Sequence, residues 1–229
     1  MLRYFTRALG QLDDPIFRRV LLLGLIGAFI AFIGAYLAAR WGLGRVSAYD
    51  FAWADRAVDW ALELGGLAAF LIAAYLLFPA VATAMMGLFL DDIVDAVEAR
   101  HYPARRASRR LGVLAGVTAG LRLGLAIVFW NLLALPLYLI LWFTGVGAII
   151  LYGLLNGYLL GREYLEMVAL RHMKGRDAKR QRKANRGTVL GVGLAGTALF
   201  MIPVVNLLAP LLTTAAAVHA FHAIADDEA

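Results

Sequence analysis

The feature that most constrains this chain is a run of 39 residues without a charged side chain, at positions 123–161. A bilayer core about 30 Å thick is crossed by roughly 20 helical residues, so the run is too long for one span. Pro136 and the glycine-containing segment 144–147 lie inside it. Because proline and glycine bend or interrupt helices, the run predicts a helical hairpin that enters the membrane and returns.

Basic residues flank this run on both sides. Nine lysines and arginines lie between Arg162 and Arg186, and four arginines lie at positions 105, 106, 109 and 110. Lysine and arginine close to membrane segments remain in the cytoplasm. Two basic flanks on one side require an even number of crossings, or a hairpin that dips into the membrane without crossing it.

The composition agrees with a membrane protein. Hydrophobic residues make up 62% of the chain and charged residues 17%, with a mean hydropathy of +0.74. Soluble domains contain about 45–50% apolar and about 25% charged residues. The net charge of +6 is explained by the cytoplasmic basic segments, so we expect no nucleic-acid partner. There is no cysteine, which excludes disulfides and thiolate metal sites.

The first half of the chain predicts three helices. Residues 1–14 carry Leu2, Phe5, Leu9 and Leu12 at helical spacing, as in an amphipathic helix that lies in the headgroup plane. Proline suits the first turn of a helix, so Pro15 is expected to open the first transmembrane helix, at 15–40. Residues 62–102 form the second, which continues as a cytoplasmic extension. The weakly basic segment between them is placed outside.

The second half predicts two hairpins, at 111–175 and 187–225. The second contains another 39 residues without formal charge, interrupted at 202–206. Their arms are close to the minimum length, so the hairpins either span fully or penetrate only partway. We expect the turns at Gly145 and Pro203 to be buried against protein, because irregular backbone inside a membrane needs protein or water around it. The fold class is all-α integral membrane protein, with residues 1–229 as one membrane domain.

Several polar residues allow two interpretations. The acidic row 91–98 suits a metal site or, as we favour, a solvated face paired with nearby arginines. His219 and His222 suit a metal pair or, as we favour, packed or interfacial histidines, and we predict no metal and no cofactor. Pore-lining or helix-packing roles are open to Arg122, Asn131, Asn156 and Asn206.

Four stretches in this order resemble the CysZ-type sulfate permeases of the larger etoposide-induced-protein superfamily. They are the segment 15–19, Phe89 with Val97 and Glu98, the segment 157–164, and the segment 202–206 with Pro210. The resemblance implies two long transmembrane helices, two hairpins that enter the membrane partway, homo-oligomers, and sulfate uptake for cysteine synthesis. Two positions depart from the family pattern: Ile16 stands in place of a glycine and Leu88 in place of a proline.

The resemblance also implies an anion site at Ile16, Phe17, Arg18 and Arg19, where the family has its sulfate-contacting motif. The chemistry is suitable, because helix N-termini and arginine side chains both attract oxyanions. The rival explanation is that Arg18 and Arg19 serve only the positive-inside rule.

The leading hypothesis is a sulfate channel or permease of the bacterial inner membrane, with both termini cytoplasmic. The sequence contains no nucleotide loop or nucleophile elbow, so we do not expect an enzyme. The alternative is a structural or regulatory membrane protein that binds partners through its basic cytoplasmic face. The expected partners are sulfate or a similar oxyanion, the lipid bilayer and further copies of the chain.

Overall fold

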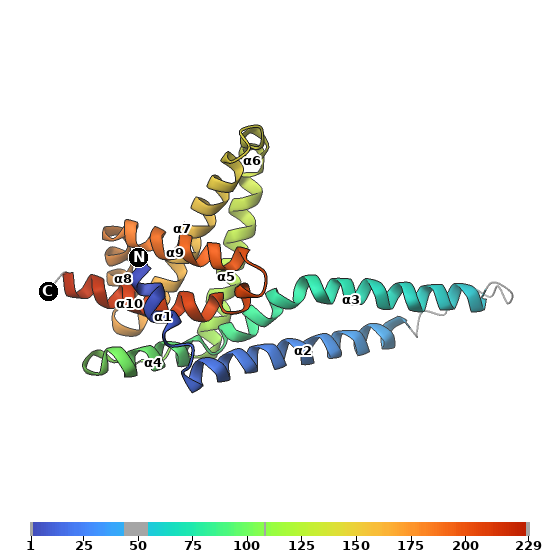
Figure 1. The fold of residues 1–229 in the computed structure, drawn as a ribbon, viewed down its shortest axis with the longest axis horizontal. Coiled ribbons are helices and arrows are strands. Elements are labelled where there is room, and N and C mark those ends of the chain that lie inside the picture. The colour runs from blue at the N-terminus through green and yellow to red at the C-terminus, as the bar shows by residue number, and fades with distance from the viewer. Residues whose placement is uncertain (1, 44–54, 108, 228–229) are drawn as a thin grey trace. The chain divides into compact units, whose positions relative to one another are not determined.

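The structure is a computed structural model that describes residues 2–43, 55–107 and 109–227, and every regular element in these ranges is helical (Figure 1). Three of these helices are long and apolar enough to cross a membrane. The predicted class, an all-α membrane protein, is therefore confirmed. The chain divides into two compact units, one of residues 23–85 and one of residues 1–22 with 86–229.

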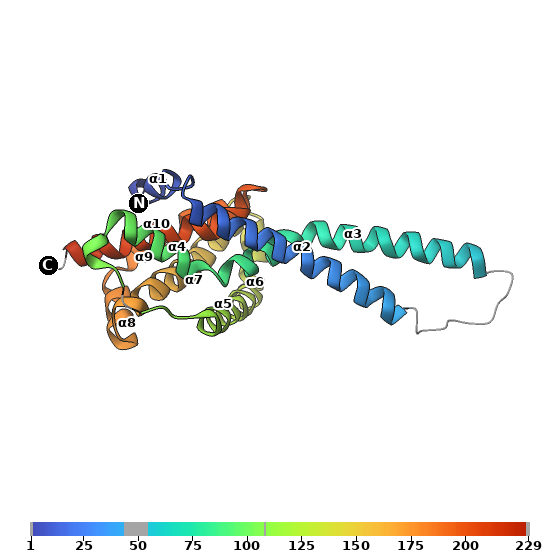
Figure 2. The same ribbon diagram turned by 90° about the horizontal axis from the view of Figure 1, so that it is seen from below.

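The smaller unit consists of most of α2 (Pro15–Leu43) and α3 (Asp55–Gly87). The two helices run side by side in opposite directions (Figures 1 and 2). Phe32 of α2 packs against Phe70 and Phe78 of α3, with ring centroids 6.4 and 6.2 Å apart. Pro15 begins α2, as its position in the sequence predicts. Segments of 28 and 24 residues in these helices meet the requirements of a membrane span.

The larger unit begins with α1 (Leu2–Leu9), which packs along α10 (Ala209–Asp227). Ala8 is buried in this contact, whereas the Leu2 side chain is exposed. The Gln11 side chain is also buried and donates a hydrogen bond to the carbonyl oxygen of Ala96 in α4 (Leu90–His101), at 3.2 Å. The amphipathic segment is therefore helical, and one of its faces is covered by the rest of the larger unit.

The first hairpin contains α5 (Val113–Leu133), α6 (Leu135–Trp142) and α7 (Gly147–His172). Proline lies in the first turn of α6, where the path of the chain changes after Ala134. The turn that follows contains Gly145 at φ 76° and ends where the Gly147 amide donates to the Thr144 hydroxyl, at 2.8 Å. The hairpin turn therefore lies where the glycines predicted it. A segment of α5, residues 116–133, is the third candidate span.

The second hairpin contains α9 (Arg186–Met201), the short 3₁₀ helix η2 (Val205–Leu207) and α10. Val204 lies at φ 68°, and the Val205 amide donates to the Pro203 carbonyl oxygen at 2.8 Å, which is the pattern of a γ-turn. Positive φ is unfavourable for a β-branched residue, so this turn is strained. Its position agrees with the predicted interruption at 202–206.

The expectation that both turns are buried is wrong for the single chain. Phe143 and Val146, beside Gly145, are 91% and 60% exposed, and Val204 is 78% exposed. These apolar side chains are exposed because no other described segment of the chain covers them. Exposure of these apolar side chains to water is unfavourable, whereas lipid or another protein chain can cover them.

The two hairpins contact each other through glycines in α7 and α9. A Cβ atom on Gly193 would overlap the Gly157 carbonyl oxygen, and one on Gly161 would overlap the Val189 carbonyl oxygen. The helix backbones therefore touch directly. This agrees with the interpretation of the glycine-rich segments as close helix contacts.

Candidate functional site

The predicted anion site lies at the first turn of α2. Ile16, Arg18 and Arg19 are exposed there, and Phe17 is buried. Phe17 anchors the turn in the protein, and the two arginines that follow it are exposed. The position therefore offers two accessible positive charges next to a helix N-terminus, which is the combination that oxyanions prefer.

Two carboxylates already interact with this turn. The Asp14 side chain accepts a hydrogen bond from the Ile16 amide at 2.9 Å, as a helix-capping residue does. The Asp13 carboxylate lies 3.0 Å from the Arg18 guanidinium, and these side chains are 93% and 68% exposed. The Arg18 amide donates to the Asp14 carbonyl oxygen at 3.2 Å. An anion bound here would compete with both carboxylates.

Asn131 and Asn156 form a reciprocal pair of hydrogen bonds between α5 and α7. Each amide group donates to the other's oxygen, at 2.8 and 3.1 Å, and the Tyr138 hydroxyl of α6 adds a bond of 2.8 Å to the Asn131 oxygen. Both amide groups also donate to backbone carbonyls one turn earlier. These asparagines link the three helices of the first hairpin, which is the packing role open to them.

Arg122 and Asn206 do not join this network. Arg122 is exposed on α5. The Asn206 side-chain oxygen is buried and has no hydrogen-bond partner among the described residues, while its backbone amide donates to the Ile202 carbonyl oxygen at 2.9 Å. The four hairpin candidates are therefore distributed over both hairpins.

The acidic row on α4 forms a charge cluster with two arginines. The Arg171 side chain is fully buried, and its guanidinium contacts the carboxylates of Asp91, at 2.8 Å, and Asp95. Arg110 contacts Asp95 and, at 3.2 Å, Asp92. The pairing with arginines agrees with the favoured interpretation of these acids. Their setting is less solvated than expected, because the three aspartate side chains are only 18–30% exposed.

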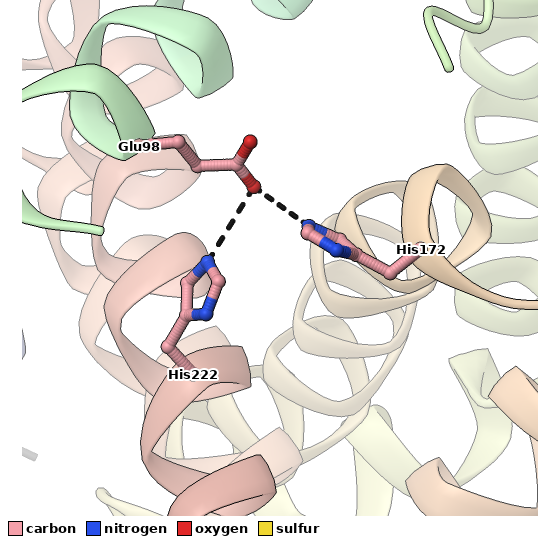
Figure 3. A group of neighbouring side chains, drawn as sticks. All are labelled: Glu98, His172 and His222. Carbon is pink, nitrogen blue, oxygen red and sulfur yellow. Dashed lines mark hydrogen bonds and ion pairs between the residues drawn. The ribbon is translucent and has the colours of Figure 1, made fainter. Parts of the chain in front are cut away.

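Glu98 differs from the three aspartates, because its side chain is buried. Its Oε1 atom lies 2.7 Å from Nε2 of His172 and 3.5 Å from Nε2 of His222, and its Oε2 atom accepts a hydrogen bond from the Ala107 amide at 2.9 Å (Figure 3). Burial raises the pKa of this carboxyl, but the interactions with the two histidines and the Ala107 amide outweigh it and lower the pKa well below its usual range. Glu98 is therefore an ionised carboxylate in the protein interior.

Three histidines contact Tyr102, which follows α4, and the fourth, His172, packs against one of them. The Tyr102 ring stacks on His222 at 3.9 Å, and its hydroxyl is 2.9 Å from Nδ1 of His219. His101 packs against His219, and His172 against His222, with ring centroids 4.9 and 5.4 Å apart. The favoured interpretation of His219 and His222 as packed histidines agrees with their burial. Glu98, His172 and His222 also form a group whose geometry could hold a metal ion.

The comparison with protein families decides the assignment. The family model described as sulfate transporter CysZ/etoposide-induced protein 2.4 matches residues 4–210, from α1 into the first turn of α10. The chain belongs to this family. The resemblance inferred from the sequence motifs is therefore confirmed. Among curated proteins, none gives a significant match to the chain.

The residues that carry the resemblance to the CysZ-type transporters lie at different places in the fold. The arginines of the segment 15–19 lie at the start of α2, whereas Glu98 belongs to the histidine group. Sequence reasoning did not single out Arg171 or His172. Both residues lie in the last turn of α7, inside the predicted hairpin at 111–175. Their contacts with α4 form only once the chain has folded, so the sequence does not show them.

Proposed function

We propose that the protein is a permease or channel for sulfate, or a similar inorganic oxyanion, in the bacterial inner membrane, and that it supplies sulfur for cysteine synthesis. The observation that carries the proposal is the exposed Arg18–Arg19 pair at the start of a membrane-spanning helix, in a chain of this transporter family. The protein performs no covalent reaction in this proposal, and the anion moves down its gradient.

The start of α2 suits a dianion better than a monovalent anion. A guanidinium offers a planar fork of donors that matches the oxygens of a tetrahedral oxyanion. The electrostatic attraction between each arginine and the anion is stronger for an anion of charge −2 than for one of charge −1. The ion pair that must be displaced, Asp13 with Arg18, is largely exposed, and exposed pairs contribute only about 0.2–1 kcal/mol. Competition from Asp13 therefore weakens anion binding and does not prevent it.

The proposed assembly is a homo-oligomer with its basic segments and both termini in the cytoplasm. Apolar side chains at the two hairpin turns, among them Phe143 and Val204, are exposed in the single chain. A second copy of the chain offers these turns the protein contact that irregular backbone requires inside a membrane. The oligomer then provides the path for the ion between copies or through the hairpins.

Sulfate flux into liposomes tests this function. Purified protein is reconstituted and uptake of radiolabelled sulfate is measured for the wild type, for Arg18→Gln and Arg19→Gln singly and together, and for Arg3→Gln. Arg3 is exposed on α1, so its substitution removes the same charge at another place. We expect the double variant to lose most of the flux and Arg3→Gln to keep it. If the wild-type protein gives no sulfate flux, the proposed function is wrong. If the double variant is fully active, the proposed site is wrong.

One observation favours the alternative, a regulatory protein that binds through its basic face. Helix α8 (Gly175–Ala184) carries exposed cations at Arg176, Lys179, Arg180 and Lys183. Such a face suits acidic lipid headgroups or an acidic protein segment. If replacing these four residues by glutamine leaves sulfate flux unchanged and abolishes association with acidic vesicles, the basic face has a role separate from transport.

A further inference from the structure

The interior group of Glu98, His172 and His222 brings together three helices that are distant in the sequence. Glu98 lies in α4, His172 at the end of α7 and His222 in α10, and Figure 3 shows all three side chains pointing toward one place. One possible ligand atom of each residue lies within 4.8 Å of those of the other two. The three side chains are 1%, 17% and 2% exposed, so this is an interior site.

The group contains a buried polar atom that makes no hydrogen bond within the part of the chain that the structure describes. Nε2 of His222 is buried and makes no hydrogen bond among the described residues, although it points toward Glu98 at 3.5 Å. An unsatisfied buried polar atom costs about 1–3 kcal/mol. A hydrogen bond between Glu98 and His172 gives these two side chains a partner, but it leaves Nε2 of His222 without a hydrogen bond. A cation between the three atoms satisfies all of them.

The distances are compatible with a transition-metal ion. Metal–ligand bonds of about 2.0–2.1 Å in a tetrahedral site place the ligand atoms roughly 3.3–3.4 Å apart. The separations of Oε1 from the two Nε2 atoms, 2.7 and 3.5 Å, lie on either side of this value. Two imidazoles and one carboxylate suit zinc and other divalent first-row metals, whereas magnesium and calcium prefer sets made of oxygen only.

Neighbouring residues hold the ligands in place. Glu98 Oε2 accepts the Ala107 amide, which leaves Oε1 directed at the histidines. The Tyr102 ring stacks on His222, and the Phe221 ring stacks on His172 with centroids 4.7 Å apart. Such supporting contacts are typical of metal sites, where they fix the orientation of the ligating groups.

We propose that Glu98, His172 and His222 bind one divalent transition-metal ion of the zinc type. The ion joins α4, α7 and α10, and a set of three protein ligands leaves at least one position for water or a small anion. This inference is independent of the proposed sulfate site, because it concerns different residues at a different place in the chain.

Metal binding is measured directly on the detergent-purified full chain. The protein carries a purification tag without histidine, is treated with EDTA and is then dialysed against Zn²⁺, and bound zinc is determined by mass spectrometry. We expect one zinc ion per chain and a thermal midpoint that rises with Zn²⁺ and falls with EDTA. Co²⁺ should give visible absorption bands that Zn²⁺ removes, and the lack of cysteine leaves these bands free of thiolate contributions. Wild-type protein that binds neither ion would overturn the proposal without any variant.

Substitutions then assign the ligands. We expect Glu98→Gln, His172→Gln and His222→Gln each to weaken zinc binding at least tenfold. The matched control is His101→Gln, because His101 is an exposed histidine of the same neighbourhood that lies outside the ligand group. It should keep the wild-type affinity. If His101→Gln loses zinc as strongly as His222→Gln, or if the three ligand variants keep it, the assignment is wrong.

Discussion

The guanidinium of Arg171, at the end of α7, contacts the carboxylate of Asp91, at the start of α4, with 2.8 Å between Nη1 and Oδ1. The two residues are 80 positions apart. The Asp91 carboxylate also accepts the amides of Leu111 and Gly112 through its second oxygen, at 3.0 and 3.1 Å. One aspartate therefore joins the end of the first hairpin to the segment that precedes it.

Replacement of Arg171 should destabilise the larger unit strongly. In Arg171→Met, the Asp91 and Asp95 carboxylates lose a buried positive charge, and breaking a buried pair by removing one partner costs about 3–5 kcal/mol. The control is Arg105→Gln, whose partner Asp226 is 53% exposed, so that less than about 1 kcal/mol is expected. Thermal unfolding in detergent provides the measurement. Equal midpoints for the two variants would contradict the role given to Arg171.

The contacts of the larger unit also predict the membrane topology. Arg171 and Asp91 join the segments on both sides of the first hairpin, Gln11 joins the N-terminal segment to α4, and Arg105 contacts Asp226 near the C-terminus. All of these segments should therefore lie on one side of the membrane, as the distribution of basic residues independently predicts.

The lack of native cysteine makes this topology directly testable. Single cysteines introduced at Arg3, Lys179 and Asp226 should react with an impermeant maleimide only after the membrane is opened. A cysteine at Asp50, which lies outside the described residues, should react from outside in intact cells. External labelling at Lys179 together with protection at Asp50 would contradict the assignment.

Local signals in the sequence predicted the fold well. Pro15, Gly145 and Pro203 each act on the backbone around them, and the structure begins or interrupts helices at these positions. Three of the long uncharged runs likewise overlap the three candidate membrane spans, because the thickness of the bilayer sets the length of such segments. Such features depend on neighbours in the sequence, so they can be inferred without knowing which helices meet.

The interior clusters could not be predicted in this way. His172 and His222 lie 74 or more positions after Glu98 along the chain. The three residues meet only when α4 and α7 both pack beside α10. The acidic row was interpreted as one face of a helix, yet Glu98 is buried and the aspartates pair with arginines from two later segments. Tertiary packing separates residues that look equivalent in the sequence.

Gly193 should not tolerate a larger side chain. In Gly193→Ala the new Cβ would overlap the Gly157 carbonyl oxygen, which is backbone and cannot move without separating α7 from α9. Overpacking of this kind costs typically about 1–3 kcal/mol. Gly187→Ala, in the same helix, meets nothing within 4 Å and should be nearly neutral. The thermal midpoints of both variants check this, and a wild-type midpoint for Gly193→Ala would show that the two helices do not touch.

Removal of the carboxylates at the start of α2 should strengthen anion binding. Asp13→Asn frees the Arg18 guanidinium from its exposed partner, and Asp14→Asn removes a negative charge while keeping an oxygen that can accept the Ile16 amide. The strength of exposed pairs, about 0.2–1 kcal/mol, corresponds to sulfate binding roughly 1.5- to 5-fold tighter. Isothermal titration with sulfate measures this. Weaker binding in both variants would mean that the anion does not sit against Arg18 and the α2 amides.

Stability should fall with acid because of His219, which α10 buries against Tyr102. Burial, assisted by the nearby charges of His101, Arg7 and His222, lowers the pKa of His219 to about 3. An unfolded histidine has a pKa of about 6.5, so between pH 6.5 and 3 the unfolded state binds a proton that the folded state does not. The folded state is therefore destabilised as the pH falls through this window, by up to about 1.4 kcal/mol per pH unit.

His219→Gln tests this dependence, because glutamine keeps a polar side chain next to Tyr102 and does not titrate. Thermal midpoints are measured from pH 7 to pH 4 in EDTA, so that metal binding does not contribute. We expect the midpoint of the wild type to fall more steeply below pH 6.5 than that of the variant, since only the wild type has His219 to protonate on unfolding. Parallel curves for the two proteins would show that His219 carries no such linkage, and the remaining acid sensitivity would belong to carboxylates such as Glu98, whose pKa is lowered in the folded state.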